Sequence, residues 1–316
     1  SLVANLKNIN LQYVFNMINF HAVEFDGFAT GKVYAHNLKS DPTIEAYLNV
    51  QDFTFNLAKM GNMNAYARWK KSEQSISLNA QMNDLAENSM TRVDGTVTPG
   101  HAPGSGLNLN ITANNTNLYF LNQYTSGIFT NLQGRTTGNL RVFGPFGGID
   151  IEGDMMVKHA NMKVDILNTK YHMYNNMITI RPGKIIFKNA IIYDKNGGTQ
   201  TEGHKAVING VLAHDHFSKM TYDLDIKTDR LLAYDQEEFG DELFCGTAIA
   251  SGSVGIKGSP GILNVDINAW PEEGTLFQYN LSRPDVLTEN QFVKFVSNKK
   301  ENNKNNNLIF ENETNN

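Results

Sequence analysis

Apolar and polar residues alternate with a period of two along residues 2–279 of this 316-residue chain. Successive side chains of an extended strand point to opposite faces, so this period predicts strands with one apolar face and one polar face. The alternation is clearest in four segments, 44–50, 107–111, 222–226 and 263–269. Turn signals such as Asp94-Gly95 separate such segments, and short turns between strands predict antiparallel pairing. The chain is therefore expected to be all-β.

Helical patterns are scarce in comparison with strand patterns. Apolar residues at three-residue steps predict a short helix within 117–132, and a second short helix is expected over 288–296. Residues 298–316 are rich in Asn, Lys and Glu, which is typical of a disordered segment or a linker tail.

An internal repeat of about 114 residues runs through the chain. Glycines and strand patterns recur at this spacing in five pairs, Gly95 with Gly210, Leu109 with Leu224, Leu118 with Leu231, Gly134 with Gly246, and Gly138 with Gly252. A partial first copy contains Thr30-Gly31. We therefore expect a partial unit over 1–90 and further units over 91–205 and 206–297, each of which stacks on its neighbour and continues a shared sheet. Roughly 20 strands about 4.8 Å apart would give a ladder near 100 Å long.

The alternation limits how such a sheet can cover its apolar face. A second sheet would give a sandwich, and a curled sheet would give a barrel or an open trough. A closed barrel does not suit a repeat that can be extended, whereas an elongated, curled antiparallel sheet with an open groove suits both the repeat and the scarcity of helices. An open groove exposes more apolar surface than monomers usually do, so it is expected to have a ligand.

Charge and composition argue against several classes of function. A net charge of −5 and a pI near 5.9 provide no basic field for phosphate backbones, so no nucleic acid partner is expected. The sequence has no run of about 18 apolar residues that could span a membrane. It contains neither a G-x-S-x-G nucleophile motif nor a G-x-x-x-x-G-K-[ST] phosphate loop, so we expect no enzyme and no cofactor.

Three places in the sequence carry residues that are common in chemical sites. His214-Asp215-His216 offers two imidazoles but no third ligand at a metal-site spacing, and we interpret it as a polar turn. Cys245 lacks the neighbours of a reactive thiolate, so it is expected to be a small buried residue. The acidic segment 237–242 lacks the spacing of a calcium loop and is interpreted as a solvated loop. No metal site is predicted.

A G-x-v-x-i-x-G strand, an alternating strand and a short Gly-Thr strand follow one another near the C-terminal end of the strand region. The stretches of interest are 167–171, 185–194, 202–210, 216–226, 243–252, 254–260, 263–269 and 274–277. Together they resemble the C-terminal region of the TamB family. The resemblance covers residues 90–295 well and residues 1–90 weakly.

The resemblance implies a periplasmic segment of a longer protein that is anchored in the inner membrane of a Gram-negative envelope. It implies a β-groove that carries phospholipid between the inner and outer membranes and supports outer-membrane biogenesis. An outer-membrane barrel protein of the Omp85 type is the expected protein partner. The family supplies no catalytic residue.

Phospholipid acyl chains are the expected ligand, and the apolar members of the alternating strands are the candidate groove residues. These are Leu109, Ile111, Leu140, Val142, Leu224, Ile226, Val254, Ile256, Leu263, Val265 and Ile267. Their polar neighbours are expected to face water, namely Asn110, Arg141, Asp225, Lys257, Asn264 and Asp266. Two alternatives stay open from the sequence. One is a scaffold that templates strands of outer-membrane barrels, and the other is a structural β-sandwich repeat of a surface protein.

Overall fold

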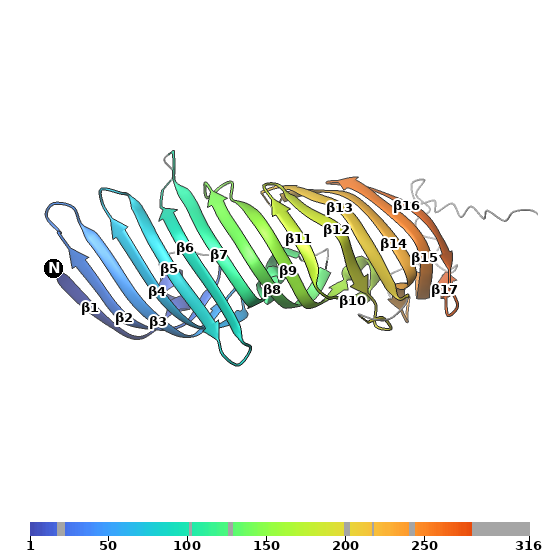
Figure 1. Ribbon diagram of the computed structural model, residues 1–316, viewed down its shortest axis with the longest axis horizontal. Helices are drawn as coiled ribbons and strands as arrows, with labels where there is room; N and C mark the ends of the chain where they lie inside the picture. The colour runs from blue at the N-terminus through green and yellow to red at the C-terminus, as the bar shows by residue number, and fades with distance from the viewer. Residues whose placement is uncertain are drawn as a thin grey trace, which may run out of the picture.

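A computed structural model describes residues 1–17, 23–100, 103–125, 129–198, 203–216, 218–239 and 244–279 (Figure 1). These residues form one antiparallel sheet of 17 strands, together with short helical segments. Figure 1 shows the strands side by side along the long axis of the molecule, from β1 at the N-terminal end to β16 and β17 at the other. The expected all-β, elongated antiparallel sheet is confirmed, and the described residues do not form the second sheet that a sandwich requires.

The elements follow one another along the chain with short connections. The strands are β1 (Leu2–Asn10), β2 (Phe25–His36), β3 (Thr43–Phe55), β4 (Ala58–Lys70), β5 (Ser75–Asp84), β6 (Ser89–Thr98), β7 (Gly106–Asn117), β8 (Phe129–Gly144), β9 (Asp150–Val164), β10 (Thr169–Met173), β11 (Asn176–Arg181), β12 (Lys184–Tyr193), β13 (Lys205–Asp215), β14 (Ser218–Gln236), β15 (Phe244–Ser259), β16 (Ile262–Pro271) and β17 (Leu276–Tyr279). The helical segments are α1 (Leu11–Met17), η1 (Tyr119–Leu121), α2 (Asn122–Thr125) and η2 (Asp165–Leu167).

Each strand pairs with the next one in the chain, with two exceptions. The strands β10 and β11 are two pieces of one position in the sheet, because both pair with β9 and with β12. In the same way, β16 and β17 both pair with β15. Two strands therefore add no length, and the sheet spans roughly 70 Å across its strands at about 4.8 Å per strand. The expectation of roughly 20 strands and 100 Å was too high for the described residues.

The sheet is continuous across the boundaries that the repeat suggested. The boundary after residue 90 lies within β6, and the boundary after residue 205 lies at the first residue of β13. Both strands pair with their neighbours on either side. The division into 1–90, 91–205 and 206–297 stays a prediction, and the expected tail at 298–316 lies outside the described residues.

One type of β-bulge, among several register shifts in the sheet, recurs about once per repeat. Asn8, Asn115 and Arg230 each have a left-handed backbone and lie where the register shifts. The backbone N–H of each donates to a hydroxyl on the next strand, at 3.1 Å to Thr30, 3.0 Å to Thr137 and 2.8 Å to Ser251. A bulge bends its strand and increases the local twist.

The same three hydroxyl residues each precede a glycine of the repeat, in Thr30-Gly31, Thr137-Gly138 and Ser251-Gly252. A Cβ on any of these glycines would lie 2.0–2.3 Å from a carbonyl oxygen of the paired strand. Glycine is therefore required for the close approach of the two backbones. The repeated dipeptide is thus the sequence signature of a bulge opposite a glycine.

The buried core lies at and beyond these bulges. Three clusters of buried side chains are centred on Val50 and Phe53, on Leu118 and Leu132, and on Tyr171 and Leu231. Leu11, the first residue of α1, packs against the first cluster. The core thus fills one end of the curled strands.

The helix expected within 117–132 is shorter than predicted. Among the described residues of this range only η1 and α2 are helical, and β8 begins at Phe129, so Leu132 lies in a strand. The three-residue steps end at Tyr124, and the spacing from Phe129 to Leu132 reflects a register shift between Thr130 and Gln133 within β8. The helix expected over 288–296 lies outside the described residues.

Candidate functional site

One face of the sheet is apolar from end to end. We call it the inner face, because residues such as Ala29, Val50 and Ala113 on this face belong to the buried core or extend into it. Directly paired residues form rows that cross the strands. One row consists of Leu6, Gly31, Leu48, Ala65, Ala80, Val93, Ile111, Leu140, Gly153, Ile180, Ile185, Leu212, Tyr222 and Gly258.

A second row lies closer to the core and is equally apolar. It consists of Ala29, Val50, Met63, Met82, Thr91, Ala113, Gly138, Met155, Ile178, Phe187, Gly210, Leu224, Ile256 and Val265. Its polar member Thr91 shares a hydrogen bond of 2.7 Å with Thr116, which satisfies both buried hydroxyls. Neither row contains a charged side chain.

The sequence-predicted groove residues lie opposite one another on this face. Leu109 pairs with Val142, and Ile111 pairs with Leu140. On the C-terminal strands, Leu224 pairs with Ile256, Ile226 with Val254, Val265 with Ile256, and Ile267 with Val254. The first eight of the predicted residues are half-buried, whereas Val265 and Ile267 are exposed because β16 has no further strand beside it among the described residues. The side chain of Leu263 lies outside the described residues.

The polar neighbours of these residues are all exposed, and they lie on the opposite, outer face. They are Asn110, Arg141, Asp225, Lys257, Asn264 and Asp266. Arg141 pairs with Asn110 and forms a salt bridge of 3.2 Å with Glu152. The two faces therefore differ sharply in polarity. Contact between the inner face and lipid stays a prediction.

The predicted residues form two patches, and residues that the sequence reasoning missed connect them. One patch lies on β7 and β8 and the other on β14 to β16. Between them, Ile178 and Ile180 of β11 face Phe187 and Ile185 of β12. The alternation of Ile178-Thr179-Ile180 gives a usable signal for β11. In contrast, β12 is apolar at successive positions such as Ile185 and Ile186, which hides its period.

Specific hydrogen bonds hold the buried polar groups at the core end of the strands. The carboxylate of Asp194 is fully buried and accepts from the backbone N–H of Leu232 at 2.6 Å and of Asn196 at 2.8 Å. The hydroxyl of Tyr171 donates to the carbonyl of Leu232 at 2.9 Å. Burial raises the pKa of Tyr171 to about 12. These groups are engaged in the fold, which leaves the apolar surface as the main feature of the inner face.

The structure describes His214, His216 and Cys245 but only part of the acidic segment. Cys245 is buried, as expected for a small core residue. Burial lowers the pKa of His214, while His216 lies exposed with its ring 3.7 Å from Asp150. In the part of the chain that the structure describes, no group of three or more His, Cys, Asp or Glu side chains could hold a metal ion. Residues 240–242 of the acidic segment lie outside that part.

Comparison with known families gives one match. Residues 195–315 match the TamB C-terminal domain. This confirms the resemblance for the C-terminal part, while the resemblance over residues 90–194 stays a prediction. Comparisons with curated proteins and with solved structures gave no significant match. None of the helices in the described ranges has the length and hydropathy needed to cross a membrane.

Proposed function

We propose that this chain, whose residues 195–315 match the TamB C-terminal domain, carries phospholipid acyl chains along the inner face of its sheet. The family is generally associated with transport of lipid or protein in the cell envelope. We further propose that the chain acts in the periplasm, as a segment of a longer protein anchored in the inner membrane. There it would move phospholipid between the two membranes and support outer-membrane biogenesis, with an Omp85-type barrel protein as a partner.

The single observation that carries this proposal is the uninterrupted apolar inner face. Transfer of an acyl chain into water costs about 0.8 kcal/mol per CH₂, so a chain of about 16 carbons needs on the order of 10 kcal/mol of compensation. That compensation is needed at every step of the path. Rows of apolar residues that cross the strands from β1 to β16 without a charge supply it continuously.

The partial burial of the candidate residues is also consistent with an open path. The side chains of Leu224 and Ile256 are only partly buried, so some of their apolar surface stays accessible to a ligand. An acyl chain could remove that surface from water, while a polar headgroup stays at the open side. Such a mechanism needs no catalytic group and no charged residue within the groove.

The proposal can be tested with a charge placed on either face of β16. Val265 and Asn264 are adjacent, both are exposed, and they lie on opposite faces. Val265→Asp places a carboxylate on the apolar path, where it must keep water with it or shift its pKa. We expect it to reduce the phospholipid recovered by mass spectrometry of the purified protein by about threefold or more. Asn264→Asp adds the same charge to the outer face and should leave recovery unchanged.

Photo-crosslinking in cells gives an independent readout at the same two positions. A photoreactive residue at 265 should form lipid adducts, and one at 264 should not. Equal labelling at both positions would contradict the proposal. Protein adducts without lipid adducts would do so as well.

A second candidate function is supported by the edges of the sheet. The strand β1 pairs only with β2, and β16 pairs only with β15, among the described residues. Leu2 and Val3 of β1 and Ile262 of β16 are exposed. A free edge can add a strand from another protein, so the sheet could template strands of outer-membrane barrels. Adducts between β1 or β16 and an outer-membrane barrel, without lipid on the inner face, would favour this function.

A further inference from the structure

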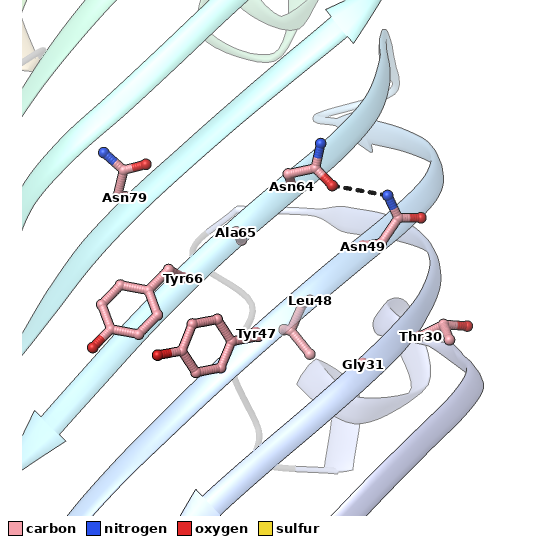
Figure 2. Close-up of a pocket in the computed structure, with 9 residues that line it drawn as sticks. All are labelled: Thr30, Gly31, Tyr47, Leu48, Asn49, Asn64, Ala65, Tyr66 and Asn79. Atoms are coloured by element: carbon pink, nitrogen blue, oxygen red, sulfur yellow. Dashed lines mark hydrogen bonds between the residues drawn. The ribbon is translucent and has the colours of Figure 1, made fainter.

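A hollow of about 450 Å³ lies across β2, β3, β4 and β5 (Figure 2). Its size falls within the range of small-molecule sites. The hollow is lined by Thr30, Gly31, Tyr47, Leu48, Asn49, Asn64, Ala65, Tyr66 and Asn79. The polar and aromatic members alternate along their strands with inner-face residues such as Leu48 and Ala65, so they belong to the outer face. These polar and aromatic side chains therefore lie on the face opposite the proposed lipid path, whereas Gly31, Leu48 and Ala65, which also line the hollow, belong to an inner-face row.

Two tyrosines form the aromatic part of the hollow. Tyr47 and Tyr66 are directly paired on β3 and β4, and their ring centroids lie 4.8 Å apart. Tyr47 is 49% exposed, although it lies within the sheet and has a strand on each side. A cross-strand aromatic pair stabilises a sheet by about 0.2–1 kcal/mol through the contact between the rings. That contact leaves half of the Tyr47 surface free for a ligand.

Three amides lie beside the tyrosines, as Figure 2 shows. The side-chain N–H of Asn49 donates to the side-chain oxygen of Asn64 at 2.9 Å, which holds these two amides in register. Each amide has a carbonyl oxygen and two N–H donors, so the pair keeps further hydrogen-bonding capacity. Asn79 is paired with Tyr66 and extends the polar rim onto β5. The hollow thus combines an aromatic surface with adjacent donors and acceptors.

None of the nine lining residues carries a charge, and Lys32, which is directly paired with Tyr47, lies outside this set. A phosphate, a nucleotide or an acidic peptide would find no cation among the lining residues themselves. The nearby carboxylate of Glu45 accepts from the hydroxyl of Tyr66 at 3.1 Å and is another acceptor for hydroxyl groups. A ligand that suits this arrangement is neutral and rich in hydroxyls, with an apolar surface that stacks on an aromatic ring.

A sugar ring has these properties, because one side presents C–H groups and its edge presents adjacent hydroxyls. We infer that the hollow on the outer face of β2 to β5 is a binding site for a neutral saccharide. Tyr47 stacks on the sugar ring, and the paired amides of Asn49 and Asn64 bind its hydroxyls. Cell-wall glycan strands and other glucans share this chemistry, so the probes must distinguish them.

The test is a calorimetric titration of the purified 316-residue chain with tetra-N-acetylchitotetraose and, separately, with maltotetraose. We expect saturable binding of at least one probe in the millimolar range or tighter, as suits a shallow open site. Binding of chitotetraose alone would assign the site to N-acetylated glycan strands, and binding of maltotetraose would assign it to glucans. Failure of both probes to bind would overturn the inference.

Two variants establish where the probe binds. Tyr47→Ala should weaken binding about tenfold or more, because it removes the stacking surface. Tyr34→Ala is the matched control, since Tyr34 is an aromatic neighbour of Tyr47 at 6.0 Å that does not line the hollow. It should leave the affinity within about twofold. Equal loss in both variants would overturn the inference.

A second variant covers the case in which Tyr47→Ala does not fold, as judged by circular dichroism. Asn64→Ala keeps both rings and removes one amide, and it should weaken binding about fivefold or more. Unchanged binding in a folded Asn64→Ala would overturn the proposed site. None of these measurements involves lipid, so their outcome is independent of the proposed function.

Discussion

Two glycines of β15 allow a test of whether close backbone approach is needed for the stability of the sheet. Gly252 and Gly255 lie three residues apart on this strand, and each is replaced by alanine in a separate variant. A Cβ at Gly252 would lie 2.3 Å from the carbonyl oxygen of Asn268 and 2.5 Å from the Cα of Ala269. At Gly255, the nearest atom would be 3.8 Å away, which is ordinary van der Waals contact.

The magnitudes follow from these distances and from the backbone. Gly252 has a φ of +147°, which an L-residue rarely adopts, and such strain costs about 1–3 kcal/mol. The clash is with backbone atoms, which cannot rotate away, and overpacking of this kind costs about 1–3 kcal/mol more. We therefore expect Gly252→Ala to lower the free energy of unfolding by about 2–6 kcal/mol. Gly255→Ala should be neutral or stabilise the fold by up to about 1 kcal/mol, because alanine has less freedom when unfolded.

The assay is urea unfolding of the two variants and the parent chain, followed by circular dichroism. A shift of the midpoint without a change in slope would report the loss of stability directly. Equal losses of stability in Gly252→Ala and Gly255→Ala would refute the reasoning. The close backbone approach and the positive φ on which the prediction rests are present at Gly252 and not at Gly255.

Two further predictions concern buried polar groups. Asp194→Ala should destabilise the chain by about 2–4 kcal/mol in the same urea assay, because it leaves the buried N–H of Leu232 without an acceptor, whereas the exposed Asp223→Ala should have almost no effect. Burial lowers the pKa of His214 below 6.5 in the folded state, so the unfolded chain binds a proton more readily and stability should fall as the pH drops through about 6.5. His214→Gln should reduce that pH dependence, and an unchanged profile would contradict the assignment.

The strand period and the repeat were readable from the sequence because both reflect backbone geometry. Alternation in segments such as 107–111 and 222–226 correctly predicted strands with one apolar face. The repeated Thr137-Gly138 and Ser251-Gly252 were visible as a pattern, although the bulge opposite each of them was not. A bulge is defined by two strands together, so the bulge residue itself, such as Asn115 opposite Thr137, carries no signal that can be interpreted alone.

The inner-face residues of β12 were not predicted from the sequence for a related reason. The bulge at Asn189 shifts the register of β12 between Phe187 and Ala190, so the apolar period changes phase within one strand. The number of positions in the sheet was overestimated because β10 and β11 occupy one position. A break within a strand resembles a turn between two strands when only the sequence is considered. The outer-face hollow was missed because its tyrosines and amides come from separate strands and converge only through their register.

The bulges explain how one sheet can combine a packed core with an open apolar surface. On the core side of Asn115 and Arg230, side chains such as Leu118 and Leu231 are buried. On the other side, Leu109 and Leu224 are only half-buried, although they are equally apolar. The stability of the fold therefore comes largely from one end of the strands, and the other end can keep accessible apolar surface without unfolding. Since the rows of the inner face reach β1 and β16, any strand that pairs with either edge must also present apolar residues on that face to continue the path.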